Sequence, residues 1–400
     1  MRVALIADVF PPLCSSGAVQ LRDLAIEFAR QGHEITTMIA SPDLESLWAI
    51  EYIDAIQVLR LRTFRTRGRG YLARTFGELL MPYLMLWGLR NSPLAGVKFD
   101  AVIWYSPTIF LGPIIKFLKN QSGCPTYLII RDIFPEWAWD IGLIRSKLVF
   151  SWFKLIANAQ YAQADVIGIQ TPGNKGYFLN WKDKHFNAQF EVLHNWLAYT
   201  PDVGCSIRVE SSKLAGRKIF VYAGNIGVAQ NVNVFCKLAK RFQYRTDLGF
   251  LFVGRGSESG KLARHYGALS NVCFCDEIDS KEIPGLFAQC HVGLIALDPR
   301  HKSHNIPGKF LSYMHAGLPV LAFVNKGNDL IELISTREVG VVVAASGEID
   351  LSLDKAAIDT LLLSQNPSVG MRCKDLAVSM FSSAKAVRQI VSALRSRVKL

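Results

Sequence analysis

Residues 299–322, PRHKSHNIPGKFLSYMHAGLPVLA, decide the fold of the C-terminal half of the chain. A Pro307-Gly308 turn leads into an apolar-periodic run, and Gly317 and Pro319, which do not prolong helices, close it. The run predicts a short helix, and the letters VLAFV that follow predict a strand. Lys309 is then placed in the first turn of that helix.

A lysine in the first turn of a helix lies beside free backbone amide groups and the positive end of the helix dipole, where a cation is normally unfavourable. An anion bound opposite explains its presence, as at the helix starts that bind phosphate. The alternative is a solvated lysine on a surface helix. Lys309 is therefore a candidate for binding a diphosphate.

The composition is that of a folded protein with an anionic partner. Half of the 400 residues are hydrophobic and 20% are charged, which predicts two or three domains without a disordered tail. The formal net charge of +12 predicts that the partner is nucleic acid, acidic lipid or a substrate that carries phosphate. Composition does not choose among the three.

Eight cysteines are scattered through the chain, and only Cys273 and Cys275 lie close together. Without a C-x-x-C pair or a Cys/His ligand spacing, neither a zinc site nor any other metal or cofactor is expected. Free thiols in a chain of this length suit a reducing cytoplasm. The N-terminal letters MRVALIADVF run directly into a strand pattern rather than a signal peptide.

Strands and helices alternate along the chain. In the N-terminal half the expected strands are 3–9, EITTMIA, AVIWYS and TYLIIRD, with helices at 19–30 and 111–120. After a polar stretch the pattern restarts with KIFVYAG, LGFLFVG, NVCFCD, VGLIAL and PVLAFV. Such alternation predicts α/β domains with parallel sheets covered by helices on both faces and ligands beyond the carboxyl ends of the strands. We expect doubly wound domains at 1–200 and 201–375, and a C-terminal helix within 376–400 that packs back toward the first domain.

Residues 60–90 break this rhythm. Arginines and aromatic residues precede an apolar run, LLMPYLMLWGL, and the arginines are Arg60, Arg62, Arg65, Arg67, Arg69 and Arg74. The run is about 11 residues long, too short to span a bilayer, which needs roughly 20. The segment favours a short helix lying on an anionic membrane surface, with Arg65, Arg67 and Arg69 as contacts. A nucleic-acid-binding patch and a solvated basic face are the alternatives.

Two loops that follow the predicted first strand of each half are rich in small residues. One contains Gly17, and the other contains Gly224 and Gly227. Glycines at such positions let backbone amides approach a pyrophosphate, although neither loop has the G-x-G-x-x-G dinucleotide pattern. A G-R-G sequence with Arg255 follows the next strand of the C-terminal half. Together with Lys309, these loops indicate a phosphate ligand in a cleft between the domains.

Residues 1–40, which contain SSGA and GHEITT, resemble the opening of family 4 glycosyltransferases, with Gly17 on the glycine of their donor loop. YLIIRDIFPEWAWDIGLI, VLHNWL, VYAGNIG and NIPGKFLSYMHAGLPVLAFVNKGNDL are similar to later landmarks of that family in the same order. The last motif is most similar to the WbuB-like branch, sugar transferases of bacterial O-antigen and capsule assembly. The resemblance implies a GT-B fold of two Rossmann-like domains. It also implies nucleotide sugar on the C-terminal domain, acceptor on the N-terminal domain, retention at the anomeric carbon and no metal.

The chain departs from that family at positions that hold the donor. The arginine and lysine of the family's donor loop correspond to Asn225 and Gln230, so two cations that neutralise phosphate are absent. Two glutamates of the family correspond to His304 and Ser312, and the second of these normally holds the ribose. The catalytic histidine of many relatives corresponds to Arg131.

Transfer of a sugar leaves a nucleoside diphosphate whose growing negative charge must be stabilised. Lys309, the helix start at Gly308 and the amides of Gly17 and Gly227 are the candidates for that role. In metal-free retaining enzymes the leaving phosphate takes the proton of the acceptor, so the resemblance requires no protein nucleophile. No Ser-His-Asp arrangement is legible in the sequence.

Asp132 and Glu136, in RDIFPE, are candidates for positioning an acceptor hydroxyl, with a strand-end turn and helix cap as the alternative. The candidate site residues are, for catalysis, Lys309, Asp132 and Arg131; for the donor, Gly17, Asn225, Gly227, Gln230, Arg255, His304, Gly308, Ser312, Asn328 and Asp329; and for acceptor or membrane, Arg65, Arg67, Arg69 and Glu136.

The sequence therefore predicts a cytoplasmic enzyme, peripheral on the inner face of the cytoplasmic membrane, that moves a sugar from a UDP-sugar to a polyprenyl diphosphate-linked saccharide. The branch resemblance points to N-acetyl-L-fucosamine as the sugar, and nucleic acid is not expected as a partner. One alternative is a nucleotide-sugar 2-epimerase of GT-B fold, which releases free sugar without an acceptor. The other is a basic nucleic-acid-binding protein, which would need a basic stripe with stacking aromatic residues.

Overall fold

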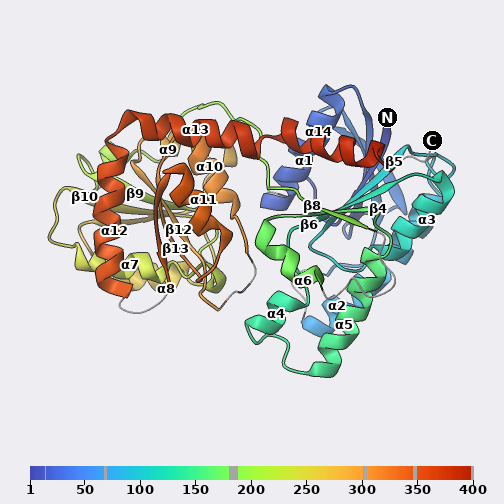
Figure 1. Ribbon diagram of the computed structural model, residues 1–400, viewed down its shortest axis with the longest axis horizontal. Helices are drawn as coiled ribbons and strands as arrows, with labels where there is room; N and C mark the ends of the chain where they lie inside the picture. Colours follow the sequence, from blue (N-terminus) through green and yellow to red (C-terminus); the bar gives the residue numbers. More distant parts are fainter. Residues whose placement is uncertain are drawn as a thin grey trace. The chain divides into compact units, whose positions relative to one another are not determined.

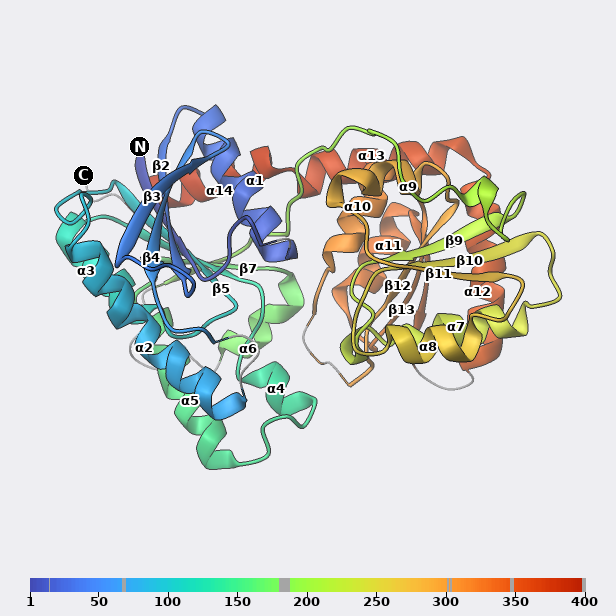
Figure 2. The ribbon, with the colours of Figure 1, turned by 180° about the vertical axis from the view of Figure 1, so that it is seen from behind.

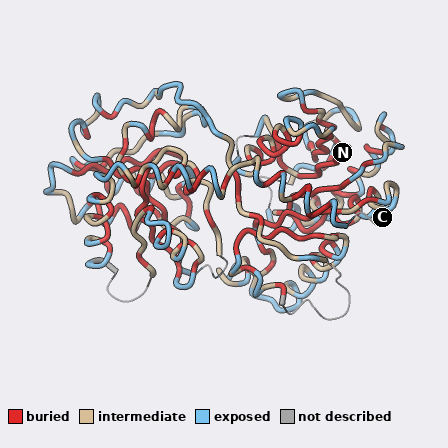
Figure 3. Tube along the Cα trace, turned by 45° about the horizontal axis from the view of Figure 1, so that its top comes forward, coloured by how far each residue is buried: buried red, intermediate tan, exposed pale blue. Residues whose placement is uncertain are grey.

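The chain forms two compact units in the computed structural model (Figure 1). The structure describes residues 1–13, 15–66, 70–179, 188–300, 302, 304–345 and 349–397. Unit 1 comprises Met1–His194 and Ser383–Leu400, and unit 2 comprises Asn195–Ser382. In both units the buried segments gather in the interior, around the strands (Figure 3).

Unit 1 is built on an eight-stranded sheet with the order β3-β4-β2-β1-β5-β6-β7-β8. Its strands are β1 (Arg2–Ala7), β2 (Glu34–Ser41), β3 (Trp48–Ile53), β4 (Ile56–Arg62), β5 (Ala101–Ser106), β6 (Thr126–Ile130), β7 (Val166–Ile169) and β8 (Gln189–Val192). All neighbouring pairs are parallel except β3 and β4, which form an antiparallel hairpin at one edge. The strand order reverses between β1 and β5, as in a doubly wound sheet.

Helices cover both faces of this sheet. They are α1 (Ser16–Arg30), α2 (Tyr71–Arg90), α3 (Gly112–Ser122), α4 (Glu136–Asp140), α5 (Lys147–Tyr161), α6 (Gly176–Leu179) and α14 (Ser383–Arg395), with a 3₁₀ turn at Pro172–Lys175. Side chains of α2, α3 and α5 share one hydrophobic core on the sheet. α14, the last helix of the chain, packs against α1 (Figure 2).

Unit 2 is built on a six-stranded parallel sheet with the order β11-β10-β9-β12-β13-β14. Its strands are β9 (Lys218–Ala223), β10 (Leu248–Val253), β11 (Val272–Cys275), β12 (Val292–Ala296), β13 (Val320–Val324) and β14 (Gly340–Ala344). This is the Rossmann strand order, and its switch point lies between β9 and β12. A ligand is therefore expected beyond the carboxyl ends of these two strands.

The helices of unit 2 form one hydrophobic core on each face of the sheet. They are α7 (Asn233–Arg241), α8 (Ser259–Tyr266), α9 (Ile283–Phe287), α10 (Gly308–Ala316), α11 (Asp329–Arg337), α12 (Ile349–Ser364) and α13 (Pro367–Phe381), with 3₁₀ turns at Val209–Ser211, Val228–Gln230 and Ser280–Glu282. α10 and α13 lie on one face, and α7, α8 and α12 lie on the other. Two doubly wound sheets confirm the predicted fold class.

The expectation of a short helix after the arginine-rich segment is wrong in its length. α2 is a single helix of 20 residues that begins at Tyr71 and contains Pro82. Its first turns are stabilised by an i,i+4 ion pair between Arg74 and Glu78, 2.7 Å apart. Among the described residues, none of the helices combines the length and the apolar character needed to cross a membrane.

Candidate functional site

Tyr313 of α10 bridges the two strands at the switch point of unit 2. Its hydroxyl lies 3.0 Å from the carbonyl oxygen of Val221 on β9 and 3.3 Å from that of Leu294 on β12. The ring lies where a Cβ atom on Gly293 would come within 2.5 Å of it, so that position requires glycine. Tyr313 thus fixes α10 across the two diverging strands, with the N-terminus of the helix at their carboxyl ends.

The start of α10 is arranged as the sequence predicts. Pro307 precedes the helix, no described side chain caps its first turn, and Gly317 ends it in a left-handed conformation with φ 74°. Asn195 fixes the residue before this turn, because its Nδ2 donates to the carbonyl oxygen of Ile306 at 2.8 Å. An uncapped helix start of this kind leaves backbone amides for an anion.

Lys309 lies against the phenol of Tyr222. Its Nζ donates to the Tyr222 hydroxyl at 2.7 Å and lies 4.2 Å from the centre of the ring. The side chain is partly buried, and the loss of water around the ammonium lowers the pKa of Lys309 to about 7. A lysine with this pKa is close to half ionised at neutral pH, and a bound anion would favour its charged form.

Tyr222 connects this lysine to the glycine-containing loop after β9. Its hydroxyl donates to the carbonyl oxygen of Asn225 at 2.7 Å, and burial raises the pKa of the phenol well above its usual value. Lys309 also runs beside the loop, because a Cβ atom on Gly224 would lie 3.7 Å from its Cε. Tyr222 was not among the predicted site residues. Its position directly before a glycine loop, at the end of the first strand of its unit, was the available signal.

The loops after β9 and β10 interlock. The amide of Gly224 donates to the carbonyl oxygen of Val253, and the amide of Ile226 donates to that of Arg255, at 2.9 and 2.8 Å. Gly254 has φ 138°, and a Cβ atom there would lie 2.0 Å from the oxygen of Gly224. Only glycine permits this approach, so the two loops form one rigid rim around the end of β9.

The predicted donor residues of this rim are mostly neutral. Asn225 donates from Nδ2 to Oε1 of Gln230 at 3.0 Å, and a Cβ atom on Gly227 would lie 3.0 Å from each of these two amide groups. The guanidinium of Arg255 pairs instead with Glu277 at 2.6 Å and is largely exposed. Lys309, in contrast, lies directly against the loop after β9.

The remaining donor candidates lie around α10 and α11. Nδ1 of His304 is 3.0 Å from a carboxylate oxygen of Asp329, and the Ser312 hydroxyl lies 3.4 Å from the carbonyl oxygen of Gly308. Asn328 is buried and caps α11, since its Oδ1 accepts from the amide of Leu330 at 2.9 Å. The structure therefore gives Asn328 a capping contact, and a donor contact of this residue stays a prediction.

In unit 1, Gly17 lies beside β5, and Arg131 directly follows β6. A Cβ atom on Gly17 would lie 3.3 Å from the hydroxyl of Tyr105 on β5. Arg131 is buried, and its Nη1 donates to the carbonyl oxygen of Leu193 at 2.8 Å. Burial lowers the pKa of Arg131 to about 10. Arg131 thus supports the backbone after β8, while the adjacent Asp132 is exposed.

Glu136 opens the short helix α4 and forms an ion pair with Lys154 of α5. Both side chains are partly buried, and burial lowers the pKa of Lys154. The pair joins α4 to α5. Its role toward an acceptor stays a prediction.

The described arginines of the arginine-rich segment have different surroundings. Arg60 lies within β4, pairs with Glu51 at 2.5 Å and donates to the carbonyl oxygen of Pro11. Arg65 is exposed and pairs with Asp43 at 2.5 Å. Arg67 and Arg69 lie outside the described residues. Grouping these arginines by sequence proximity was wrong for Arg60, because a strand position and local partners determine its contacts.

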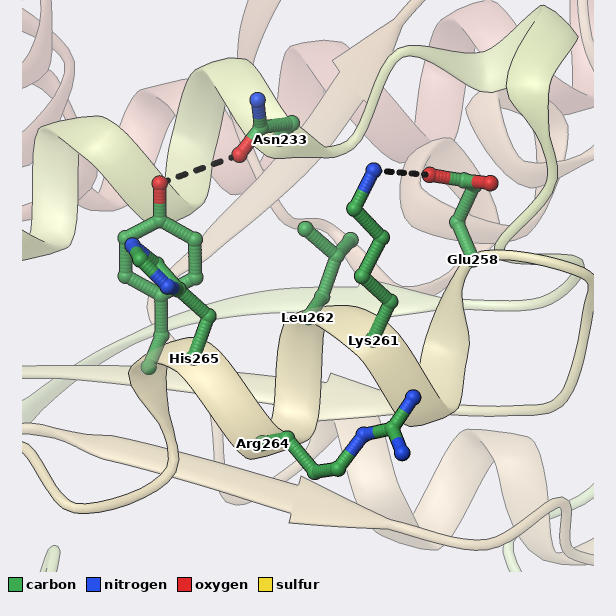
Figure 4. Close-up of a pocket in the computed structure, with 7 residues that line it drawn as sticks. Asn233, Glu258, Lys261, Leu262, Arg264 and His265 are labelled. Atoms are coloured by element: carbon green, nitrogen blue, oxygen red, sulfur yellow. Dashed lines mark hydrogen bonds and ion pairs between the residues drawn. The ribbon is translucent and has the colours of Figure 1, made fainter.

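A cavity of about 380 Å³ lies on the outer helices of unit 2 (Figure 4). It is lined by Asn233, Glu258, Lys261, Leu262, Arg264, His265 and Tyr266. None of the predicted site residues lines it. In the part of the chain that the structure describes, no three His, Cys, Asp or Glu side chains gather so as to hold a metal ion.

Comparisons with known proteins agree with this geometry. Residues 217–361 match the family model described as "Glycosyl transferases group 1". The "Probable glycosyltransferase WbjE" of Pseudomonas aeruginosa is 21% identical over 294 residues, which is 69% of this chain and 69% of that protein.

Two solved structures illustrate the fold. The structure described as "Trehalose-6-phosphate from E. coli bound with UDP-2-fluoro glucose" has a TM-score of 0.72 at 14% identity, over 100% of both chains. The structure of "WaaG, a glycosyltransferase involved in lipopolysaccharide biosynthesis" has a TM-score of 0.64 at 15% identity, over 98% of this chain and 99% of that one. The fold is GT-B. The residues that match the glycosyltransferase group 1 model lie within unit 2, which also holds Lys309 and the interlocked loops. The WbuB-like branch stays a prediction.

Proposed function

We propose that the protein is a retaining, metal-independent glycosyltransferase of family 4 that moves a sugar from a UDP-sugar to a polyprenyl diphosphate-linked saccharide. The observation that carries the proposal is the position of Lys309. Lys309 is partly buried and lies at the start of α10, beside a loop whose close packing requires glycine, at the switch point of a Rossmann sheet. This combination suits a diphosphate.

The chemistry follows from the charge of the leaving group. As the bond between sugar and phosphate breaks, negative charge grows on the diphosphate, and a cation placed in advance lowers the barrier. Lys309 supplies that cation, and the amides of Gly308 and Gly227 supply hydrogen bonds. The acceptor hydroxyl loses its proton to the departing phosphate as the new glycosidic bond forms on the face that the phosphate leaves. No protein nucleophile takes part.

The other candidate residues receive supporting roles in this proposal. In unit 2, His304 and Asp329 form a polar pair near the start of α10 that suits hydroxyl groups of the donor sugar. Asn225, Gln230, Arg255, Ser312 and Asn328 complete the donor set. In unit 1, the proposal gives the acceptor hydroxyl to Asp132, which is exposed and follows β6, with supporting roles for Arg131, Glu136 and Gly17.

The pathway is proposed from the relatives. WaaG is described as involved in lipopolysaccharide biosynthesis, and the E. coli structure is described as bound with UDP-2-fluoro glucose. We therefore place this enzyme in bacterial surface polysaccharide assembly, with N-acetyl-L-fucosamine as the sugar suggested by its WbuB-like motif. A lipid-linked acceptor requires access to a membrane, and we place the enzyme on the inner face of the cytoplasmic membrane, with Arg65, Arg67 and Arg69 near anionic lipid.

One experiment tests the assignment. The purified protein is incubated with a panel of nucleotide sugars, with and without lipid-linked saccharides extracted from bacterial membranes, in buffer that contains EDTA. We expect UDP and a glycosylated lipid to appear together, and only when both substrates are present. Release of a free, epimerised sugar without acceptor would establish the 2-epimerase instead. A strict requirement for Mg²⁺ would overturn the metal-independent mechanism.

A further inference from the structure

We propose that α2 and α5 of unit 1 together form a two-helix apolar surface that inserts into the interface of an anionic lipid bilayer. The surface consists of Leu72, Phe76, Leu79, Tyr83 and Trp87 on α2 and of Leu148, Val149, Trp152 and Leu155 on α5. This proposal depends on the proposed function only in naming a membrane as the partner. α5 lies outside the segment that sequence reasoning assigned to the membrane.

The α2 half of the surface is a stripe at helical spacing. Its five members follow one another at intervals of three or four residues, which places them on one face of the helix. Leu72 is 89% exposed and Phe76 is 61% exposed. The opposite face of α2 carries Met81, Met85 and Leu89, which are buried in the core. α2 thus has two apolar faces, and the sheet covers only one.

The α5 half repeats this arrangement. Leu148 is 84% exposed and Leu155 is 68% exposed, with Trp152 between them on the same face. Ala157 and Tyr161 bury the other face in the core that α2 also joins. A soluble surface helix normally presents polar side chains outward, so two helices of one layer with apolar outer stripes indicate a surface that something covers.

The two stripes point away from the same face of the sheet. α2, α3 and α5 contribute to one core on that face, so the outer sides of α2 and α5 both face away from it. In both ribbon views the N-terminal turns of α2 and α5 lie toward the same end of unit 1 as α4 (Figures 1 and 2). Trp139 and Leu143, in and after α4, add exposed apolar area at that end.

Charge and side-chain type favour a bilayer as the occupant. Residues 141–164 contain no Asp or Glu, and Arg145 and Lys147 lie directly before the α5 stripe. Residues 55–77 likewise contain no acidic residue and lead into the α2 stripe. Trp, Tyr and Phe side chains flanked by cations are typical of helices that lie in the headgroup region of anionic membranes. Neither helix is of the kind that crosses a membrane.

Exposed apolar residues elsewhere provide a matched control. Leu362 of α12 and Val378 of α13 are 59% and 67% exposed, and both belong to unit 2. Replacing them also removes two largely exposed apolar side chains, without touching the two-helix surface. They separate insertion of a specific surface from a general effect of lower hydrophobicity.

The test is vesicle co-sedimentation of the full chain with phosphatidylglycerol/phosphatidylcholine and with pure phosphatidylcholine vesicles. We expect wild type to bind the anionic vesicles more tightly. Leu148→Gln/Leu155→Gln and Phe76→Gln/Tyr83→Gln should each bind about 10- to 100-fold more weakly, from the apolar area that no longer inserts. Leu362→Gln/Val378→Gln should bind as wild type does. Lipids brominated near the headgroup should quench tryptophan fluorescence in wild type and less in either surface variant.

Three outcomes overturn the proposal. The first is an α5 variant that binds anionic vesicles as tightly as wild type, and the second is a wild type that does not bind them. The third is a wild-type dimer at micromolar concentration that the α5 variant does not form, because the occupant is then a second copy of the chain. The thermal shift given by UDP is measured on the same variants. If UDP raises the Tm of the variants as much as it raises that of wild type, the assignment of UDP as the donor stands, whatever the vesicle result.

Discussion

Raising the pH from 6.5 to 8.5 should weaken UDP binding to the wild-type protein by about 25-fold more than it weakens binding to Lys309→Met. The reason is the low pKa of Lys309, about 7, which burial imposes on the ammonium. A diphosphate beside Nζ stabilises the charged lysine and returns its pKa toward the ordinary range. Only the protonated lysine forms this ion pair.

The magnitude follows from the ionised fractions. With a pKa of about 7, roughly three quarters of the free protein carries the proton at pH 6.5, and about 3% carries it at pH 8.5. The ratio of these fractions gives the 25-fold factor. At pH 8.5 each molecule of UDP that binds should therefore take up about one proton from solution. The same shift affects the ligand-free fold. The pKa of Lys309 is lower in the folded protein than in the unfolded chain, so burying the charged ammonium lowers the free energy of unfolding. This destabilisation becomes smaller as the pH rises above about 7.

Isothermal titration calorimetry provides the assay. Titrations at pH 8.5 in two buffers with different ionisation enthalpies measure the number of protons taken up. Lys309→Met serves as the control, because its side chain has a similar size and no charge. The comparison with Lys309→Met also cancels the contribution of the UDP phosphate, which titrates near pH 6, because both proteins bind the same ligand. If wild type and Lys309→Met show the same proton uptake and the same change in Kd, Lys309 does not contact the diphosphate and the reasoning fails.

Three further predictions concern the same site. Lys309→Ala should lower kcat by about 100- to 1,000-fold, since one preorganised contact to a developing charge is worth about 3 to 4 kcal/mol. Circular dichroism should show that the fold of this variant is intact. Lys309→Arg should recover only part of the lost kcat, because a planar guanidinium replaces a compact ammonium. Tyr222→Phe removes the hydroxyl that joins Lys309 to Asn225, so it should lower kcat/KM about tenfold and shift the pH profile of kcat/KM. If the substitution changes only the stability of the protein, the role of Tyr222 is structural. UDP at about 100 times its Kd should stabilise the fold by roughly 2.7 kcal/mol, and it should raise the Tm more than GDP or ADP does in EDTA; equal shifts for the three nucleotides would contradict UDP as the donor.

The local signals in residues 299–322 were sufficient to predict α10 and the strand after it. Proline and glycine punctuate this stretch, and their backbone preferences act without reference to the rest of the chain. The helix begins at Gly308, Gly317 takes the left-handed conformation, and β13 follows as expected. Lys309 could be placed in a first turn for the same reason.

Several strands escaped prediction because their signals are weak or depend on partners. β3, WAIEYI, is partly polar and exists as the antiparallel edge of a hairpin with β4. β7 and β8 have only four residues each, and β14 follows α11 closely. A short strand gains most of its stability from the neighbour it pairs with, and a sequence window does not contain that neighbour.

The contact between Tyr222 and Lys309 and the exposed stripe of α5 also could not be predicted from a local stretch of sequence. Tyr222 and Lys309 are 87 positions apart, so their hydrogen bond and the low pKa of the lysine require the folded sheet. The α5 stripe looks like an ordinary amphipathic pattern in sequence. Only the structure shows that its apolar residues lie on the outside as well as the inside. Sequence reasoning found α2 because its arginines drew attention, and it had no such marker for α5.

The neutral residues around Lys309 have a consequence for selectivity. Additional cations at Asn225 and Gln230 would repel one another and the lysine before a donor bound. With one lysine that loses its proton easily, the ligand-free site avoids this repulsion and becomes cationic as the diphosphate arrives. The diphosphate then contributes less of the total affinity than it would opposite three cations. We therefore expect contacts to the base and the sugar, rather than phosphate charge, to determine which nucleotide sugar this enzyme selects.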